Sequence, residues 1–185
     1  NGNINIQATI MTTSNTTTYG IRLKDITGAG LTASGAVTIS SVAGASESIL
    51  LDNVDATAVS LGAASTVTIN NRRSNGIHAT GCAAALTFGN TTINNPNSVT
   101  VPAVRSTSCS GATTFAQANI DMNSAGGFES FTNVTTPNDN SGDGDAMYIS
   151  NYTGSGFTIN GGIIQNTGDD GIDIRNSQNL NLNGV

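Results

Sequence analysis

The stretch Ile77-His-Ala-Thr-Gly81 is one of six related blocks that recur along the chain. Each block has an apolar residue, a variable position, a second small or apolar residue and then a turn residue. The first four blocks start 28, 28 and 27 residues apart, and the last two start 25 apart. Near-constant spacing of matching blocks is typical of repeat proteins. The blocks begin at Ile21, Ile49, Ile77, Val104, Met147 and Ile172.

Two further short apolar stretches follow most blocks. Three short strands in a period of about 25 residues predict a parallel β-solenoid with in/out alternation along each strand. We expect an all-β domain over residues 1–185, with about seven coils and three short strands per coil. An antiparallel two-sheet sandwich is the alternative, because it also has short strands and frequent turns. The first stretch begins at Leu31, Val59, Leu86 and Leu180, and the second occupies 36–40, 66–70, 91–95 and 157–161.

The spacing is interrupted once, between Val104 and Met147, where the starts lie 43 residues apart. This distance accommodates either one enlarged coil or two short coils, with Phe128 or Phe131 starting the extra one. An acidic loop insertion is expected near residues 133–146.

The composition excludes several classes of protein. Only 10% of residues are charged, and 6 Lys and Arg oppose 12 Asp and Glu. So few cations argue against nucleic-acid binding. No apolar run is long enough to span a membrane. The 24 Asn, 26 Thr, 19 Ser and 22 Gly instead fit outward strand positions and turns. The isolated pair Arg72-Arg73 is predicted to be solvated.

The two cysteines each lie five residues after the start of a block. Cys82 and Cys109 should therefore stack on adjacent coils. The strand spacing of about 4.8 Å lies within the Cα separation that a disulfide allows. We expect a Cys82–Cys109 disulfide; the alternative is a reduced pair in an inward-facing column.

Acidic residues gather late in the chain. Asp145 and Asp170 each precede a block by two residues, so they should stack, with Asp169 beside them. Carboxylates this close raise at least one pKa, as acid/base chemistry on sugars requires. The alternative is turn chemistry alone, since Asp and Gly favour turns.

The same region contains the start of a calcium-loop pattern, Asp-x-Ser-x-Asp-Gly-Asp. Asp139, Ser141, Asp143 and Asp145 would supply the oxygen ligands that calcium prefers. Ser150 stands where an EF-hand needs Glu, so the loop is not an EF-hand. The alternative is a solvated acidic loop without metal.

The stretch Gly162-Ile-Ile-Gln-Asn-Thr-Gly-Asp-Asp-Gly-Ile-Asp-Ile-Arg-Asn-Ser resembles the repeats of right-handed parallel β-helix proteins of the pectate-lyase-like type, as found in large exported bacterial surface proteins. The resemblance implies a right-handed coil. The three late Asp residues also resemble the active site of polygalacturonase-type β-helix glycosidases. That family's Asn-Thr before the first Asp, its Gly-His-Gly and its Arg-x-Lys have no counterpart here.

We therefore expect a non-enzymatic structural segment of an exported, cell-surface adhesin-like or filament-forming protein. Its expected partners are neighbouring coils or subunits stacked end to end, and surface glycans. No cofactor is expected. One alternative is a polysaccharide-degrading glycoside hydrolase that uses Asp145, Asp169 and Asp170. A further alternative is a phage tailspike or carbohydrate-binding rod.

Overall fold

The structure, a computed structural model, describes residues 4–7, 10–12, 19–28, 30–40, 46–70, 72–94, 101–122, 145–167 and 170–185. In this part of the chain the fold is an all-β parallel β-solenoid of about five turns, with two parallel sheets per turn and no helix. Every described strand pair is parallel, so the sandwich alternative is wrong. None of the described residues belongs to a helix long and apolar enough to cross a membrane.

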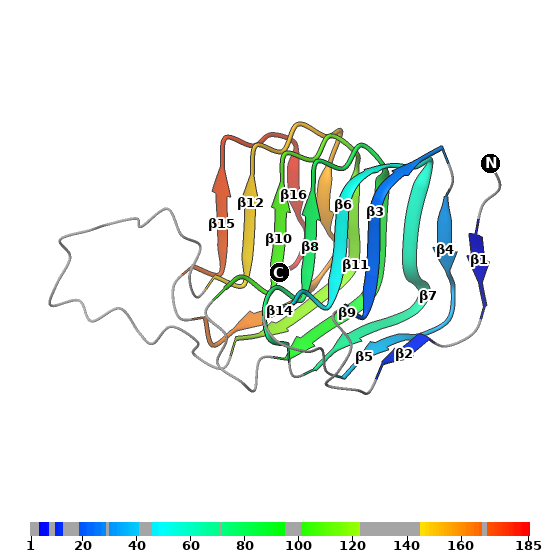
Figure 1. Ribbon diagram of the computed structural model, residues 1–185. Coiled ribbons are helices and arrows are strands. Elements are labelled where there is room, and N and C mark those ends of the chain that lie inside the picture. Colours follow the sequence, from blue (N-terminus) through cyan, green and yellow to red (C-terminus); the bar gives the residue numbers. More distant parts are fainter. Residues whose placement is uncertain are drawn as a thin grey trace, which may run out of the picture.

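The six predicted blocks form one six-stranded sheet. Its strands stand side by side in chain order in Figure 1. Ile21 pairs with Ile49, Ile49 with Ile77, and Ile77 with Val104. Val104 pairs with Met147, which pairs with Ile172, so the predicted register is confirmed throughout this sheet. The strands are β3 (Ile21–Thr27), β6 (Ile49–Asp55), β8 (Ile77–Thr80), β10 (Val104–Thr107), β12 (Met147–Ser150) and β15 (Ile172–Arg175).

The remaining strands form a ten-stranded sheet that bends along its length (Figure 1). In the middle turns, the second and third predicted strands are continuous and form one long strand. These long strands are β7 (Ala58–Ile69), β9 (Ala85–Asn94) and β11 (Thr113–Asp121). The shorter strands are β1 (Ile4–Ile6), β2 (Ile10–Thr12), β4 (Leu31–Ala33), β5 (Val37–Ile39), β13 (Phe157–Ile159), β14 (Gly162–Gln165) and β16 (Leu180–Leu182).

The expectation of three separate strands in every coil is therefore wrong for the middle turns. At the bend the pairing of β7 with β9 shifts register between Leu61 and Thr66, and glycines lie on both strands there. Gly62 has a φ of +59°, and a Cβ placed on Gly89 would lie 1.8 Å from the Gly62 carbonyl oxygen. Two adjacent backbones can approach this closely only where neither carries a side chain.

The number of turns and the place of one strand also differ from expectation. Direct pairing of Val104 with Met147 shows that one enlarged coil, without a further strand of this sheet, separates them. The structure thus has about five turns where the sequence predicted about seven coils. Phe157 pairs with Thr113 and Leu180, so its strand is the second of its turn and not the third. The third strand there is β14, which pairs with β11.

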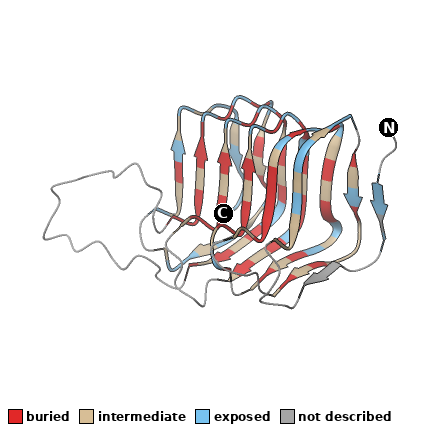
Figure 2. Cartoon of the chain, viewed as in Figure 1, coloured by how far each residue is buried: buried red, intermediate tan, exposed pale blue. Residues whose placement is uncertain are grey.

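Buried positions recur at matching places on consecutive turns (Figure 2). Their side chains form one continuous core. One column contains three phenylalanines, each at most 1% exposed. The Phe88 and Phe115 ring centroids lie 4.7 Å apart, and those of Phe115 and Phe157 lie 6.0 Å apart. Burial of an aromatic side chain of this kind stabilises the fold by roughly 1.5–3 kcal/mol.

The turn residue that ends each block has a left-handed backbone conformation. Its φ lies between +47° and +60° in all six blocks. Asn, Asp and Gly tolerate this region better than other residues, which explains the composition of the turn column. The column consists of Asp25, Asn53, Gly81, Ser108, Asn151 and Asn176.

Arg72 is buried, which corrects the prediction that both members of the Arg72-Arg73 pair are solvated. Its side chain is 0% exposed, whereas Arg73 is exposed. Arg72 Nη1 donates to the carbonyl oxygens of Ser74 and Val101, both at 2.8 Å. Burial lowers the pKa of Arg72 to about 10. The guanidinium therefore links the segment around Ser74 to Val101 on the next turn through hydrogen bonds.

Candidate functional site

The two described residues of the predicted acidic site lie on adjacent turns, as expected, but in different environments. Asp145 lies two residues before the start of β12 and is 1% exposed, whereas Asp170 is exposed. Asp145 Oδ1 accepts a hydrogen bond from the backbone N–H of Asp170 at 3.1 Å. Asp169 lies outside the described residues. The buried Asp145 carboxylate thus fastens the next turn and is not presented to a polysaccharide.

The predicted calcium loop falls mostly outside the part of the chain that the structure describes. Asp139, Ser141 and Asp143 are not among the described residues. Asp145 is described, and one of its carboxylate oxygens is engaged by the turn. Among the described residues there is no group of three or more His, Cys, Asp and Glu side chains that could hold a metal ion. The calcium hypothesis stays a prediction.

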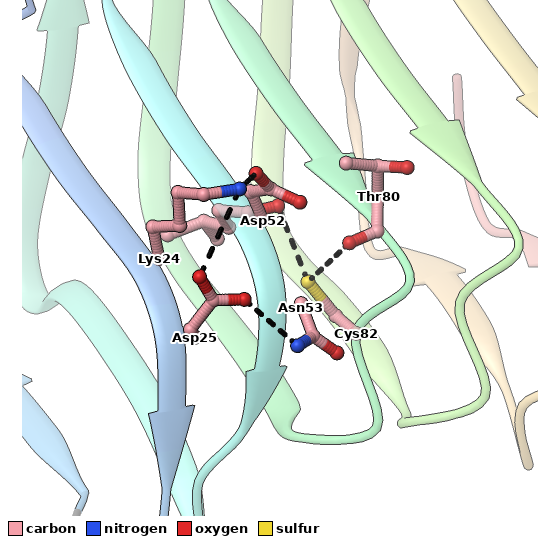
Figure 3. Close-up of polar contacts among 7 residues, drawn as sticks. Lys24, Asp25, Asp52, Asn53, Thr80 and Cys82 are labelled. Carbon is pink, nitrogen blue, oxygen red and sulfur yellow. Dashed lines mark hydrogen bonds and ion pairs between the residues drawn. The ribbon is translucent and has the colours of Figure 1, made fainter.

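The two cysteines stack as predicted but are not bridged. Cys82 follows β8 and Cys109 follows β10, and the two buried side chains are free thiols. Cys82 Sγ donates to the carbonyl oxygens of Leu51 at 3.3 Å and Thr80 at 3.5 Å (Figure 3). Thiols that donate to backbone carbonyls belong to the reduced alternative, so the structure does not contain the expected disulfide.

Charged side chains gather on the outer face of the six-stranded sheet. We call these residues the charged face. Because outward positions stack in register, opposite charges from adjacent turns meet. Lys24 forms an ion pair with Asp52, and the hydrogen bond with Asp52 raises the pKa of Lys24. Asn53 Nδ2 donates to Asp25 Oδ1 at 2.9 Å just beyond this pair (Figure 3). The charged face consists of Arg22, Lys24, Asp52, His78, Arg105, Tyr148, Asp173 and Arg175.

An aromatic ring between two guanidinium groups lies at the other end of the charged face. The Arg105 guanidinium carbon lies 5.2 Å from the centroid of Tyr148, and that of Arg175 lies 5.6 Å from it. Asp173 Oδ2 accepts a hydrogen bond from Arg175 Nε at 2.7 Å. The hydrogen bond with Asp173 raises the pKa of Arg175. The two cation–π contacts of Tyr148 thus join three consecutive turns.

The charged face is the feature that sequence reasoning missed. Its signal was present, because outward positions of the six-stranded sheet hold four of the six Lys and Arg residues, namely Arg22, Lys24, Arg105 and Arg175. Exposed ion pairs such as Lys24–Asp52 add little stability. Chemically, the face offers fixed guanidinium, carboxylate and phenol groups and contains no nucleophile–base pair.

No protein-family model, curated protein or solved structure matches the chain. The fold and the geometry of these side chains are therefore the basis of the proposed function.

Proposed function

We propose that the chain is a structural solenoid segment of an exported, cell-surface adhesin-like or filament-forming protein. The observation that carries this proposal is that inward-facing residues of the last turn are exposed. Ile174 and Leu182 occupy inward positions but are 41% and 42% exposed. The residues that they pair with on the preceding turn, Ile149 and Ile159, are 0% exposed. A further turn stacked on β15 and β16 would bury both side chains.

The physical logic is that of a stiff repeating rod. Each turn contacts only its neighbours, so stability accumulates turn by turn. An open parallel strand edge also offers unpaired backbone groups, which recruit another strand. The covering turn that we propose is the first turn of a second copy of the chain, stacked end to end.

The hydrolase alternative finds less support in the geometry. A retaining or inverting glycosidase needs two carboxyl groups that both reach the scissile bond. Asp145 is 1% exposed and one of its oxygens accepts the backbone N–H of Asp170. We therefore propose that Asp145 stabilises the adjacent turn through this hydrogen bond, and we propose no catalytic role for it.

Electron microscopy and sedimentation of the purified chain test the proposal. We expect rods much longer than the roughly 20–25 Å that about five turns occupy at the strand spacing. Ile174→Lys and Leu182→Lys should abolish the long rods, because each places a charge in the stacking interface. Asn181→Lys adds the same charge at an exposed, outward position of β16 and should leave assembly unchanged.

Two results contradict the proposal. The first is a chain that stays monomeric and monodisperse at every concentration tested, which would remove end-to-end stacking. The second is release of reducing ends from an acidic polysaccharide that disappears in Asp170→Asn, which would establish the hydrolase instead.

A further inference from the structure

A groove of about 180 Å³ runs across the outer face of the ten-stranded sheet, on the last turns of the solenoid. It crosses β9, β11 and β14, which pair in parallel register. We call it the amide groove. Its lining residues are Thr92, Asn94, Asn119, Ile120, Asp121, Ile163 and Gln165.

The polar side chains of the amide groove form an ordered network with open hydrogen-bonding groups. Asn94 Nδ2 donates to Asn70 Oδ1 at 2.8 Å, and Gln165 Nε2 donates to Asp121 Oδ2 at 3.0 Å. These bonds hold one column of side chains along the groove. Within the described part of the chain, the Thr92 hydroxyl and the Asn119 amide make no hydrogen bond, so they remain available to a ligand.

Ile163 is an apolar residue in a column whose members on the four preceding turns are polar. The register places it outward, in line with Thr38, Thr68, Thr92 and Asn119 on the preceding turns. It is 62% exposed, the largest value among the exposed large hydrophobic side chains of the described residues. Covering this exposed side chain with the apolar face of a ligand would be favourable.

We propose that the amide groove binds a neutral glycan chain. Amide and hydroxyl groups both donate and accept, as sugar hydroxyls require of a partner. The Ile163 side chain offers an apolar surface to the C–H face of a sugar ring. None of the described residues that line the groove is a cation, so an acidic glycan would find no opposite charge among them.

This inference deepens the proposed adhesin-like role, because it assigns a ligand class to the side of the rod. It depends on a different surface from end-to-end stacking, which involves inward residues of the last turn. Glycan binding and rod assembly are therefore measured separately, and the failure of one leaves the other intact.

Titration calorimetry of the full chain tests the inference. The probes are neutral hexasaccharides of glucose, mannose and N-acetylglucosamine, with hexagalacturonate as the acidic comparison. We expect at least one neutral probe to bind more tightly than the acidic one. Asn119→Ala and Ile163→Ser should each weaken that binding by about five- to tenfold, the effect of one lost contact. Thr38→Val, in the same column three turns before Asn119, is the matched control and should bind as the unaltered chain does.

Three results would overturn the inference. They are no binding of any neutral probe, tighter binding of hexagalacturonate, and equal weakening by Thr38→Val. Circular dichroism melting of each variant shows whether a loss of binding reflects unfolding, because all three positions face outward and should leave the melting temperature unchanged.

Discussion

Cys82 and Cys109 occupy the same register position on adjacent turns, and both sulfur atoms lie inside the solenoid. The two side chains are 0% and 1% exposed. The hydrogen bond with the Cys109 sulfur and burial together raise the pKa of the Cys82 thiol. Because only the thiolate attacks other sulfur compounds, the folded state should protect Cys82 chemically.

The first prediction concerns the reactivity of these thiols. In the reduced, folded chain, an aromatic disulfide reagent at pH 8 should label Cys82 at least about tenfold more slowly than in denaturant, because the raised pKa lowers the thiolate fraction. The rate should rise as the pH increases toward that pKa. Absorbance of the released thiolate measures it. Immediate labelling of the folded chain would contradict the buried placement.

A second prediction compares the adjacent arginines. Arg72→Ala should lower the free energy of unfolding by about 2–4 kcal/mol, because it leaves a cavity and several buried carbonyl oxygens without a donor. Arg72→Met keeps most of the packing volume but no donor, so it separates the two causes. Arg73→Ala, at the exposed neighbour, should change stability by less than about 0.5 kcal/mol. Denaturant titration measures all three, and equal losses for the two Ala variants would contradict the buried position of Arg72.

A third prediction tests the left-handed column through its backbone. Asn151 has a φ of +51° and an exposed side chain, so substitution there changes conformational preference and few contacts. Asn151→Val should destabilise the fold by about 1–2 kcal/mol, whereas Asn151→Gly should be neutral or slightly stabilising. Thr153→Val, an exposed position of the same turn, is the control. Thermal melting that ranks Val above Gly at position 151 would contradict the assigned conformation.

The spacing of the blocks was sufficient to predict the six-stranded sheet, because parallel stacking forces equivalent residues into one column. It failed where unrelated strands share a local pattern. Phe157-Thr-Ile and Thr66-Val-Thr-Ile look alike in sequence, yet the first pairs with Thr113 and belongs to the second strand of its turn. A strand of three or four residues carries too little information to fix its place without its neighbours.

The burial of individual polar residues could not be predicted from the sequence, for a different reason. Arg72 and Arg73 are the same residue type in the same turn, and only the path of the next turn decides which one meets the carbonyl of Val101. The amide groove was likewise hidden, because its outward columns become visible only when the register of β9, β11 and β14 is known.

The last prediction separates a supporting role from a catalytic role in the acidic pair. Asp145 is buried and accepts the Asp170 N–H, so Asp145→Ala should lower the free energy of unfolding by about 1–3 kcal/mol. Asp145→Asn retains an acceptor oxygen and should cost less. Asp170→Ala removes an exposed side chain but keeps the backbone donor, and should change stability by less than about 0.5 kcal/mol. In a catalytic pair, Asp170→Ala would likewise keep its stability but would lose polysaccharide cleavage. Assays of unfolding and of reducing-end release on the same preparations therefore decide between the two roles.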